Sequence, residues 1–266
     1  MNKILLLIPH YNNTKGLINS ISSIDEKENI DIIIVDDGSK KYIIDEVEIK
    51  NRFKAKGKIY FKYLSENKGI EVALNIGLDF ALSENKYKYI ARLDCGDICL
   101  GKRFKIQSDF LEKNPEIKLV GSYVRAHCVD GNHLFDLVRP ILHEQIKKKM
   151  YLNSMFVHPA VMFSVDAVKI IGKYPTNYKS AEDYAYFFQF VKRFRVANID
   201  QFLLQIEINE TGISYVRRKE QVLNRIRIIK NNFYFGFYPI YGIFRSIALY
   251  IMPYKLIFSL KRIFLK

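Results

Sequence analysis

The segment IIIVDDGS, residues 32–39, joins four β-branched residues to two aspartates and a Gly-Ser pair. A short run that is apolar at every position is typical of a strand buried on both faces of a sheet. Asp, Gly and Ser directly after the run favour a tight turn and the first residues of a helix. The segment therefore predicts one strand-to-helix connection of an α/β fold.

The same design recurs through the first half of the chain. Besides Ile32–Val35, three apolar runs share it, at 4–8, 59–64 and 89–93. Helix-like stretches separate the four runs, at 14–24, 39–53 and 69–82. Strands and helices that alternate in this way predict a mostly parallel sheet with helices on both faces. Ligands of such sheets bind beyond the carboxyl ends of the strands, so the polar residues after each strand are candidates for a site.

The second half of the chain predicts a more mixed arrangement. The turn-forming pair Asp130-Gly131 lies between apolar runs at 119–124 and 133–138, which predicts a β-hairpin. The remaining pattern predicts helices and strands, with helices at 143–152 and 180–193 and strands at 159–163, 196–199 and 202–208.

Length and charge limit the classes of protein that this chain can be. It has 266 residues, enough for one large α/β domain, and a formal net charge of +14. Most of that charge lies in residues 217–266, where eleven Lys or Arg accompany a single acid, Glu220. A nucleic-acid-binding protein would carry a basic face on its folded module, so we expect no nucleic-acid partner. No linker rich in Gly, Pro or Ser is visible, and we expect one domain over 1–215 with a helical extension over 216–266.

Cysteine content and hydropathy predict a cytoplasmic location. Three cysteines are too few for a disulfide scaffold and are typical of a reducing compartment. The apolar run at 4–8 is too short for a secretion signal. No uninterrupted stretch of about 18 apolar residues predicts a membrane-spanning helix.

The basic tail has the composition of a segment that lies on a membrane surface. Leu223, Ile226 and Ile229 have helical spacing with basic residues between them, and aromatic and aliphatic residues dominate beyond Phe233. Such segments suit the headgroup region of an anionic bilayer. The alternative is a terminal helix that packs on the domain and turns its basic residues to solvent. We expect a protein held peripherally on the inner face of the inner membrane.

Two pairs of acids follow predicted strands. Asp94 and Asp97 come directly after the run at 89–93, where carboxylates suit a Mg²⁺ that also binds a diphosphate. Capping of the turn is the other interpretation, and the spacing alone does not separate the two. Asp36 and Asp37 could accept a hydrogen bond from a nucleotide base or serve only the turn.

A second group of candidates lies in the later part of the chain. Glu182 and Asp183 lie at a predicted helix start. Together with Ser180 they match a capping box, and the helix dipole stabilises acids in the first turn. The functional alternative is a general base that takes a proton from an attacking hydroxyl. His158 precedes an apolar run and is either a structural residue or a ligand of metal or phosphate.

Taken in order, the motifs of residues 3 to about 200 resemble those of a family 2 glycosyltransferase with the GT-A fold. The matching motifs are Ile8–Asn12, Val35–Ser39, Asn67–Gly69, Ala73–Leu78, Ala91–Asp97, Arg103-Phe104 with Gln107, Asn114-Pro115, Val120-Gly121, His158–Phe163 and Glu182–Tyr184. The resemblance implies a Rossmann-like, mostly parallel sheet flanked by helices. It also implies an inverting transfer of a sugar from a nucleotide sugar, by default UDP-linked, with Mn²⁺ or Mg²⁺ as cofactor. The implied acceptor is a hydroxyl of a lipid-linked molecule, oligosaccharide or polysaccharide in O-antigen, capsule or lipooligosaccharide synthesis.

The resemblance further implies a role for each candidate residue. Asp183 would be the general base, with Glu182 in support. Asp94, Asp97 and His158 would hold the metal. The implied nucleotide-sugar-binding residues are Pro9, Tyr11, Asn12, Asp36, Asp37, Asn67, Gly69, Arg92 and Asp94.

One departure and two alternatives accompany this prediction. The commoner family pattern is Asp-x-Asp-Asp, and here Gly96 occupies the third place, which leaves open which acid binds a metal and how strictly one is needed. A nucleotidyltransferase would need a Gly-rich, basic phosphate loop, which Pro9–Gly16 does not provide. A non-catalytic membrane-binding module would use the acidic clusters only as caps.

Overall fold

The computed structural model describes residues 3–128, 130–208 and 217–252. The strands in chain order are β1 (Ile4–His10), β2 (Asp31–Asp36), β3 (Ile59–Tyr63), β4 (Tyr89–Arg92), β5 (Ile98–Cys99), β6 (Ile117–Cys128), β7 (His133–Leu137), β8 (Met162–Ser164) and β9 (Arg195–Ile208). The helices are α1 (Thr14–Ser22), α2 (Glu46–Arg52), α3 (Ile70–Glu84), α4 (Arg103–Lys113), α5 (His143–Lys149), the 3₁₀ turn η1 (His158–Ala160), α6 (Val165–Ile171), α7 (Glu182–Arg193), α9 (Arg218–Asn231) and α10 (Phe237–Ile251).

All nine described strands join one sheet in the order β3-β2-β1-β4-β8-β6-β9-β5, with β7 paired to β6. The pairs β1–β2, β2–β3 and β1–β4 are parallel, which confirms the parallel sheet expected for the first half. Strand order reverses at β1, since β2 lies on one side of it and β4 on the other. The crevice beyond such a switch point is where ligands bind in open α/β sheets.

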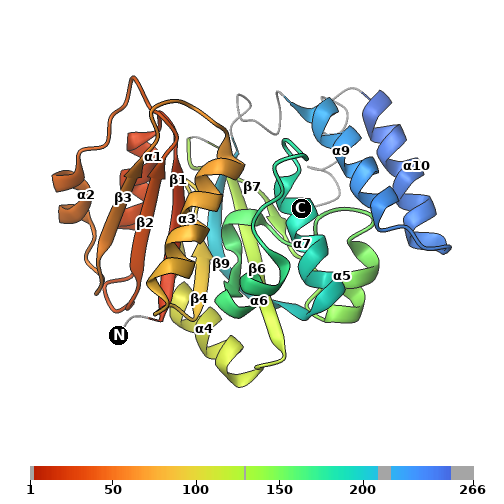
Figure 1. Ribbon diagram of the computed structural model, residues 1–266, viewed down its shortest axis with the longest axis horizontal. Coiled ribbons are helices and arrows are strands. Elements are labelled where there is room, and N and C mark those ends of the chain that lie inside the picture. The colour runs from red at the N-terminus through yellow and green to blue at the C-terminus, as the bar shows by residue number, and fades with distance from the viewer. Residues whose placement is uncertain (1–2, 129, 209–216, 253–266) are drawn as a thin grey trace.

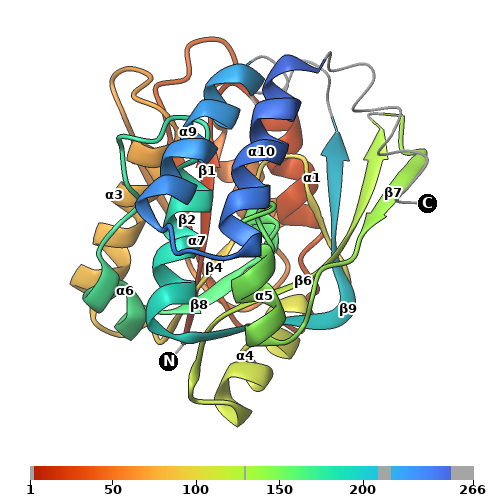
Figure 2. The same cartoon turned by 90° about the vertical axis from the view of Figure 1, so that its right-hand side faces the viewer.

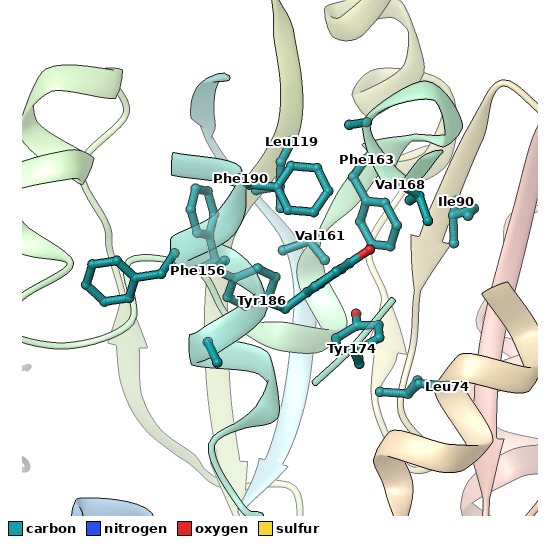
Figure 3. Packing of buried hydrophobic residues seen from close by; sticks show 14 of the residues in the cluster. Leu74, Ile90, Leu119, Phe156, Val161, Phe163, Val168, Tyr174, Tyr186 and Phe190 are labelled. Atoms are coloured by element: carbon teal, nitrogen blue, oxygen red, sulfur yellow. The ribbon is translucent and has the colours of Figure 1, made fainter. Parts of the chain in front are cut away.

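Helices cover both faces of the sheet and form two apolar cores (Figure 1). Leu5 and Leu7 of β1 face a core shared with α3, α6 and α7, whose aromatic centre is drawn in Figure 3. Ile4, Leu6 and Ile8 point to the opposite face, where α1, α2 and α4 pack. This alternation follows from the two-residue period of a strand. Together the two cores hold the carboxyl end of β1 in place.

The second half confirms some expectations and corrects others. The hairpin is present, since β6 and β7 pair antiparallel around residues 130–132. The two strands expected at 196–199 and 202–208 are wrong as separate elements, because β9 runs through both with register shifts against β6. The apolar run at 159–163 begins as η1, with Pro159 in its first turn, and becomes strand only at Met162.

The C-terminal helices lie side by side against the end of the sheet that is farther from β3 (Figures 1 and 2). Helix α9 packs on α7 through Ile228 and Ile229, and α10 packs on α9. The predicted boundary between 1–215 and 216–266 falls outside the described residues, and it stays a prediction.

Helix α10 differs from an ordinary surface helix, because small residues lie on its buried face and most of its large apolar residues are exposed. Gly242 and Ser246 are buried against the body of the protein, and a Cβ at Gly242 would lie 2.1 Å from the carbonyl oxygen of Tyr151. Tyr238 and Ile243 pack against the core, but six other large apolar residues of α10 are exposed. This α10 stripe consists of Phe237, Ile240, Tyr241, Phe244, Ile247 and Ile251. Within the described ranges no helix is long and apolar enough to cross a membrane.

Candidate active site

The loops that follow β1 and β4 form one rim at the carboxyl edge of the sheet. The Cys95 thiol donates to the carbonyl of Pro9 over 3.3 Å. The Gly96 N–H donates to the carbonyl of Gly16 over 3.1 Å. The Asn13 amide donates to the carbonyl of Cys95 over 3.1 Å. Residues that are far apart in the sequence are thereby joined at the expected edge.

A buried imidazole anchors Asp36 at the end of β2. His10 Nδ1 lies 2.6 Å from Asp36 Oδ2, and its Nε2 accepts the backbone N–H of Asn13 over 3.2 Å. The ring therefore carries its proton on Nδ1 and donates it to Asp36. Asp36 Oδ1 accepts the N–H of Ser39 over 2.8 Å. Burial raises the pKa of Asp36, but the hydrogen bonds from Ser39 and His10 outweigh it and lower the pKa below its usual value.

Asp37 organises the neighbouring loop between β3 and α3. Its two carboxylate oxygens accept the N–H groups of Lys68 and Gly69 over 2.8 and 3.0 Å. Gly69 has a φ of +100°, a region that favours glycine, and this lets the loop turn into α3. Asn67 stays exposed in the same loop. Both aspartates thus serve their turns, and base recognition by them stays a prediction.

Tyr11 and Asn12 follow β1 at the open side of the rim. Asn12 has a φ of +50°, and its Oδ1 accepts the N–H groups of Lys40 and Lys41 over 3.2 and 3.1 Å. Tyr11 is 50% exposed, so its ring is accessible to a stacked partner. Their contact with a nucleotide stays a prediction.

Arg92, at the end of β4, is fully buried and ties three parts of the site together. Its Nη1 donates to the carbonyl of Leu7 and its Nη2 to Asp94 Oδ1, each over 2.7 Å. Its Nε donates to His158 Nε2 over 3.4 Å, and the Tyr174 hydroxyl donates to the same nitrogen over 3.0 Å. Burial and the charge of Arg92 hold the pKa of His158 well below its usual value, so this ring is neutral. Its Nε2 lone pair already accepts two donors, and a metal role for His158 stays a prediction.

Asp94 and Asp97 are suited to share a divalent cation with a diphosphate. Asp97 is buried, and burial together with the negative charge of Asp94 raises its pKa well above the usual value. A hydrogen bond from the N–H of Glu207 over 3.4 Å and the charges of Arg103 and Arg92 offset this in part. A cation would relieve the repulsion, and Mg²⁺ commonly takes one or two carboxylates plus phosphate oxygens. No group of three His, Cys, Asp or Glu within the described residues forms a closed metal cage.

Glu182 and Asp183 occupy the first turn of α7, but not as part of a capping box. Ser180 has a φ of +62°, its buried hydroxyl finds no hydrogen-bond partner in the part of the chain that the structure describes, and α7 has no side-chain cap there, so the predicted capping is wrong. Burial raises the pKa of Asp183, against the N–H of Tyr184 and the charge of Arg225. Burial and the charge of Asp183 raise the pKa of Glu182 to about 8. Glu182 is therefore mostly protonated at neutral pH beside a carboxylate that is readier than usual to take a proton.

The two halves of the site are close enough to influence each other. Asp94 follows β4, whereas Glu182 and Asp183 begin α7. The charge of Asp94 nevertheless raises the pKa of both Glu182 and Asp183. Asp36 and Asp97 both act on the pKa of Cys95, which burial raises most. The structure therefore brings the acids predicted from the sequence around one region at the carboxyl ends of β1, β2 and β4.

Sequence analysis missed two side chains of this region. Tyr174, between α6 and α7, reaches His158 with no local pattern to mark it. Arg225 lies on α9, and its guanidinium carbon is 5.6 Å from the ring centroid of Tyr184. The basic residues interleaved along this segment predict a membrane-facing surface. The packing of α9 on α7 instead brings Arg225 against Tyr184.

The comparison with protein families settles the relationship of this chain. Residues 6–172 match the family described as Glycosyl transferase family 2. The chain belongs to this family. The match spans β1 to α6 and includes the rim, Arg92, Asp94, Asp97 and His158, while α7 and its acids lie beyond it.

Curated members of glycosyl transferase family 2 are similar along much of the chain. The bifunctional glycosyltransferase pgtA of Dictyostelium discoideum is 27% identical over 247 residues, which cover 80% of this chain and 32% of pgtA. The amylovoran biosynthesis glycosyltransferase AmsE of Erwinia amylovora is 26% identical over 168 residues, covering 63% of this chain and 61% of AmsE. This chain thus spans about a third of the length of pgtA and less than two thirds of AmsE.

Solved structures confirm the GT-A fold expected from the motifs. S. aureus TarS 1–349 in complex with UDP has a TM-score of 0.64 at 16% identity, covering 97% of this chain and 75% of that one. The mannosyltransferase PcManGT of Pyrobaculum calidifontis, in complex with GDP-Man and Mn²⁺, has a TM-score of 0.61 at 13% identity, covering 98% and 73%. At these identities the likeness concerns the fold.

Proposed function

We propose that this family 2 glycosyltransferase transfers a sugar, with inversion, from a nucleotide sugar to a hydroxyl of a lipid-linked or oligosaccharide acceptor. The observation that carries the proposal is the position of Asp183. Asp183 is half-buried at the start of α7, desolvation raises its pKa, and the charge of Asp94 at the end of β4 adds to that rise. A base and a diphosphate-binding acid are thus near each other, as a direct displacement requires.

The donor is proposed to lie across the rim. Tyr11 is half-exposed and offers its ring for stacking. Asp36 or Asp37, both largely buried in their turns, is proposed to accept an N–H of the base. Asp94, held by Arg92, would lie beside the ribose and diphosphate. A UDP-linked donor is the proposal, supported by the UDP complex of the structurally similar TarS.

The chemistry proposed for the protein's own side chains is a single proton transfer. Asp183 takes the proton of the acceptor hydroxyl while that oxygen attacks the anomeric carbon from the face opposite the diphosphate. Glu182, protonated at neutral pH, keeps a second negative charge from forming beside the base. A Mn²⁺ or Mg²⁺ held by Asp94 and Asp97 would supply positive charge to the departing diphosphate.

The acceptor and the location are proposed from the α10 stripe. Phe237 and Phe244 are 70% and 67% exposed on a helix whose small residues face the protein. A face of this kind, near a basic chain segment, suits the headgroup region of an anionic membrane. We therefore place the enzyme on the inner face of the inner membrane, acting in O-antigen, capsule or lipooligosaccharide synthesis. AmsE, named for amylovoran biosynthesis, supports a role in polysaccharide synthesis.

A nucleotide-sugar panel tests the proposed function. The purified protein is incubated with UDP-, GDP- and dTDP-sugars, with Mn²⁺ and with excess chelator, and the release of nucleoside diphosphate is measured. We expect slow hydrolysis of one UDP-sugar, and its loss in Asp183→Asn but not in Asp109→Asn, a surface aspartate of α4 paired with Lys105. Release of pyrophosphate from a nucleoside triphosphate would instead identify a nucleotidyltransferase, and no turnover of any donor would contradict the proposal.

A further inference from the structure

Three arginines from separate elements converge beside the catalytic end of α7. Arg139 follows β7, Arg225 lies on α9 and Arg245 lies on α10. The charge of Arg245 adds to burial in lowering the pKa of Arg139, and the charge of Arg225 does the same to the pKa of Arg245. Burial raises the pKa of Tyr184 of α7, and the charges of Arg225 and Arg245 both lower it.

Contacts around Tyr184 agree with this. Arg225 lies over the Tyr184 ring, and the Tyr184 hydroxyl donates to the carbonyl of Met150. Arg245 donates to the carbonyl of Leu152. The three guanidinium groups are called the arginine cluster below.

The arginine cluster lacks the partners that half-buried cations normally have. Within the described residues none of the three makes an ion pair with a carboxylate. Among the described residues, the buried Nε atoms of Arg139 and Arg225 have no hydrogen-bond partner, and Arg245 donates only to the carbonyl of Leu152, over 2.7 Å. The charge of Arg225 lowers the pKa of Asp183, but within this part of the chain the two side chains make no ion pair. Like charges held close together are unfavourable, and buried N–H groups without an acceptor add to that cost.

An anion with several oxygen atoms would satisfy this cluster. Guanidinium groups bind phosphate through pairs of parallel N–H···O hydrogen bonds, and several of them can surround one diphosphate. The three arginines also come from different elements, the segment after β7, α9 and α10, so their donors need not lie in one plane. A single carboxylate would not use all of these donors.

The position of the cluster indicates which substrate carries the anion. The guanidinium carbon of Arg225 lies 5.6 Å from the ring centroid of Tyr184, the residue that follows the proposed base Asp183. The cluster therefore lies beside the base and is carried largely by α9 and α10, away from the strand ends that carry the donor-binding candidates, which favours the acceptor. Arg245 is also next to the α10 stripe, directly after Phe244 and four residues after Tyr241, whose ring influences its pKa.

We propose that Arg139, Arg225 and Arg245 bind a phosphate or diphosphate group of the acceptor. The inference rests on the proposed function and names the class of its acceptor, a sugar or alcohol joined to a lipid through phosphate. The cluster holds the phosphate, the α10 stripe holds the lipid beside it, and the reacting hydroxyl is thereby brought to Asp183.

The test measures binding of inorganic pyrophosphate to the full chain by calorimetry, in metal-free buffer with enough UDP to saturate the wild-type protein. We expect binding in the presence of UDP. Each of Arg139→Gln, Arg225→Gln and Arg245→Gln should weaken it at least about 10-fold, because each removes charged hydrogen bonds. Arg227→Gln is the matched control, since Arg227 is an exposed arginine of the same helix that bonds Asn224. The dissociation constant of UDP should stay within about twofold in all four variants.

Other outcomes would overturn the inference. If UDP excludes pyrophosphate, or if the three variants lose UDP affinity in parallel, the cluster serves the donor diphosphate. If they keep pyrophosphate affinity but lose binding to phosphatidylglycerol vesicles, it serves membrane headgroups. Lack of pyrophosphate binding by the wild type also overturns it. If a glutamine variant fails to fold, the same assay is carried out with Arg225→Lys and Arg245→Lys, which keep the charge but not the planar donor pair. Failure of UDP to bind the wild type would instead contradict the proposed function.

Discussion

Arg92 donates to Asp94 over 2.7 Å from a guanidinium that is itself completely buried. The carboxylate of Asp94 is partly exposed, so one end of the pair belongs to the core and the other to the site. A cation fixed in the core thus orients an acid at the surface, and the hydrogen bond from its Nη1 to the Leu7 carbonyl fixes that cation relative to β1.

Arg92→Lys should weaken donor binding more than it slows the chemical step. Lysine keeps the charge but cannot donate to Leu7, Asp94 and His158 at once, because it lacks the planar arrangement of N–H groups. We expect the KM for the nucleotide sugar to rise about 10-fold, the size of one or two lost charged hydrogen bonds. Steady-state kinetics checks this, with Arg52→Lys, a surface arginine of α2, as control. A fall in kcat at unchanged KM would contradict the positioning role.

Asp183→Asn should lower kcat by about 10²- to 10⁴-fold, the usual contribution of a general base. In the wild type, kcat/KM should fall as pH drops, through a pKa above the ordinary aspartate value, because burial favours the protonated acid. The measurement is a pH profile of donor-to-acceptor transfer. A profile that stays flat down to pH 4 would show that Asp183 is not the titrating base.

Glu182 should make the ligand-free protein less stable as pH rises. Its pKa is raised from an ordinary 4.5 to about 8 by burial, so the folded state holds a proton that the unfolded state releases. The free energy of unfolding therefore decreases between about pH 5 and pH 8. Glu182→Gln should remove more than about 1 kcal/mol of this decrease, as seen by urea denaturation at pH 5 and 8.5. Glu144→Gln, an exposed acid of α5, should change nothing, and an equal slope in both variants would refute the assignment.

Gly96→Asp should strengthen the binding of Mn²⁺ and weaken the fold. The backbone has a φ of +106° there, while a Cβ would meet no atom within 4 Å, so the side chain has room but the backbone is strained. We expect a loss of about 1–3 kcal/mol in stability, the usual range for such strain. Calorimetry with Mn²⁺ in the presence of UDP measures the gain in affinity. Unchanged Mn²⁺ affinity would indicate that this turn does not hold the metal.

Replacing Phe237 and Phe244 together by Ser should abolish binding to anionic vesicles while leaving UDP affinity unchanged. Each exposed phenylalanine can contribute about 1.5–3 kcal/mol when it is buried in another apolar phase. Flotation with phosphatidylglycerol vesicles is the measurement. Ile43→Ser with Val47→Ser, exposed apolar residues near α2, is the matched control. Equal flotation of both double variants and the wild type would refute the membrane surface on α10.

The sequence predicts the site best where one strand and the loop after it carry the information. The turns after β1, β2 and β4 were all placed at one edge, because an apolar run followed by Asp, Gly and Asn is a local signal. The pairing of His10 with Asp36 was not predicted, since nothing local distinguishes a buried histidine that donates from one that is simply packed.

Long-range packing accounts for what the sequence did not predict. Arg139, Arg225 and Arg245 lie on separate elements and come together because α9 packs on α7 and α10 packs on α9. The strand β9 was divided in two because Asp200-Gln201 interrupts its apolar pattern, and pairing with β6 carries it across that interruption. Contacts between distant elements override the local pattern in both cases.

The glycine of α10 has a consequence for which acceptors the enzyme can use. Since Gly242 leaves no room for a Cβ against Tyr151, the backbone of α10 lies directly against the body of the protein. An enzyme resting on a bilayer through such a helix holds its base at one fixed height above the lipid. Such an enzyme would select acceptor hydroxyl groups by their distance from the membrane as well as by their chemistry.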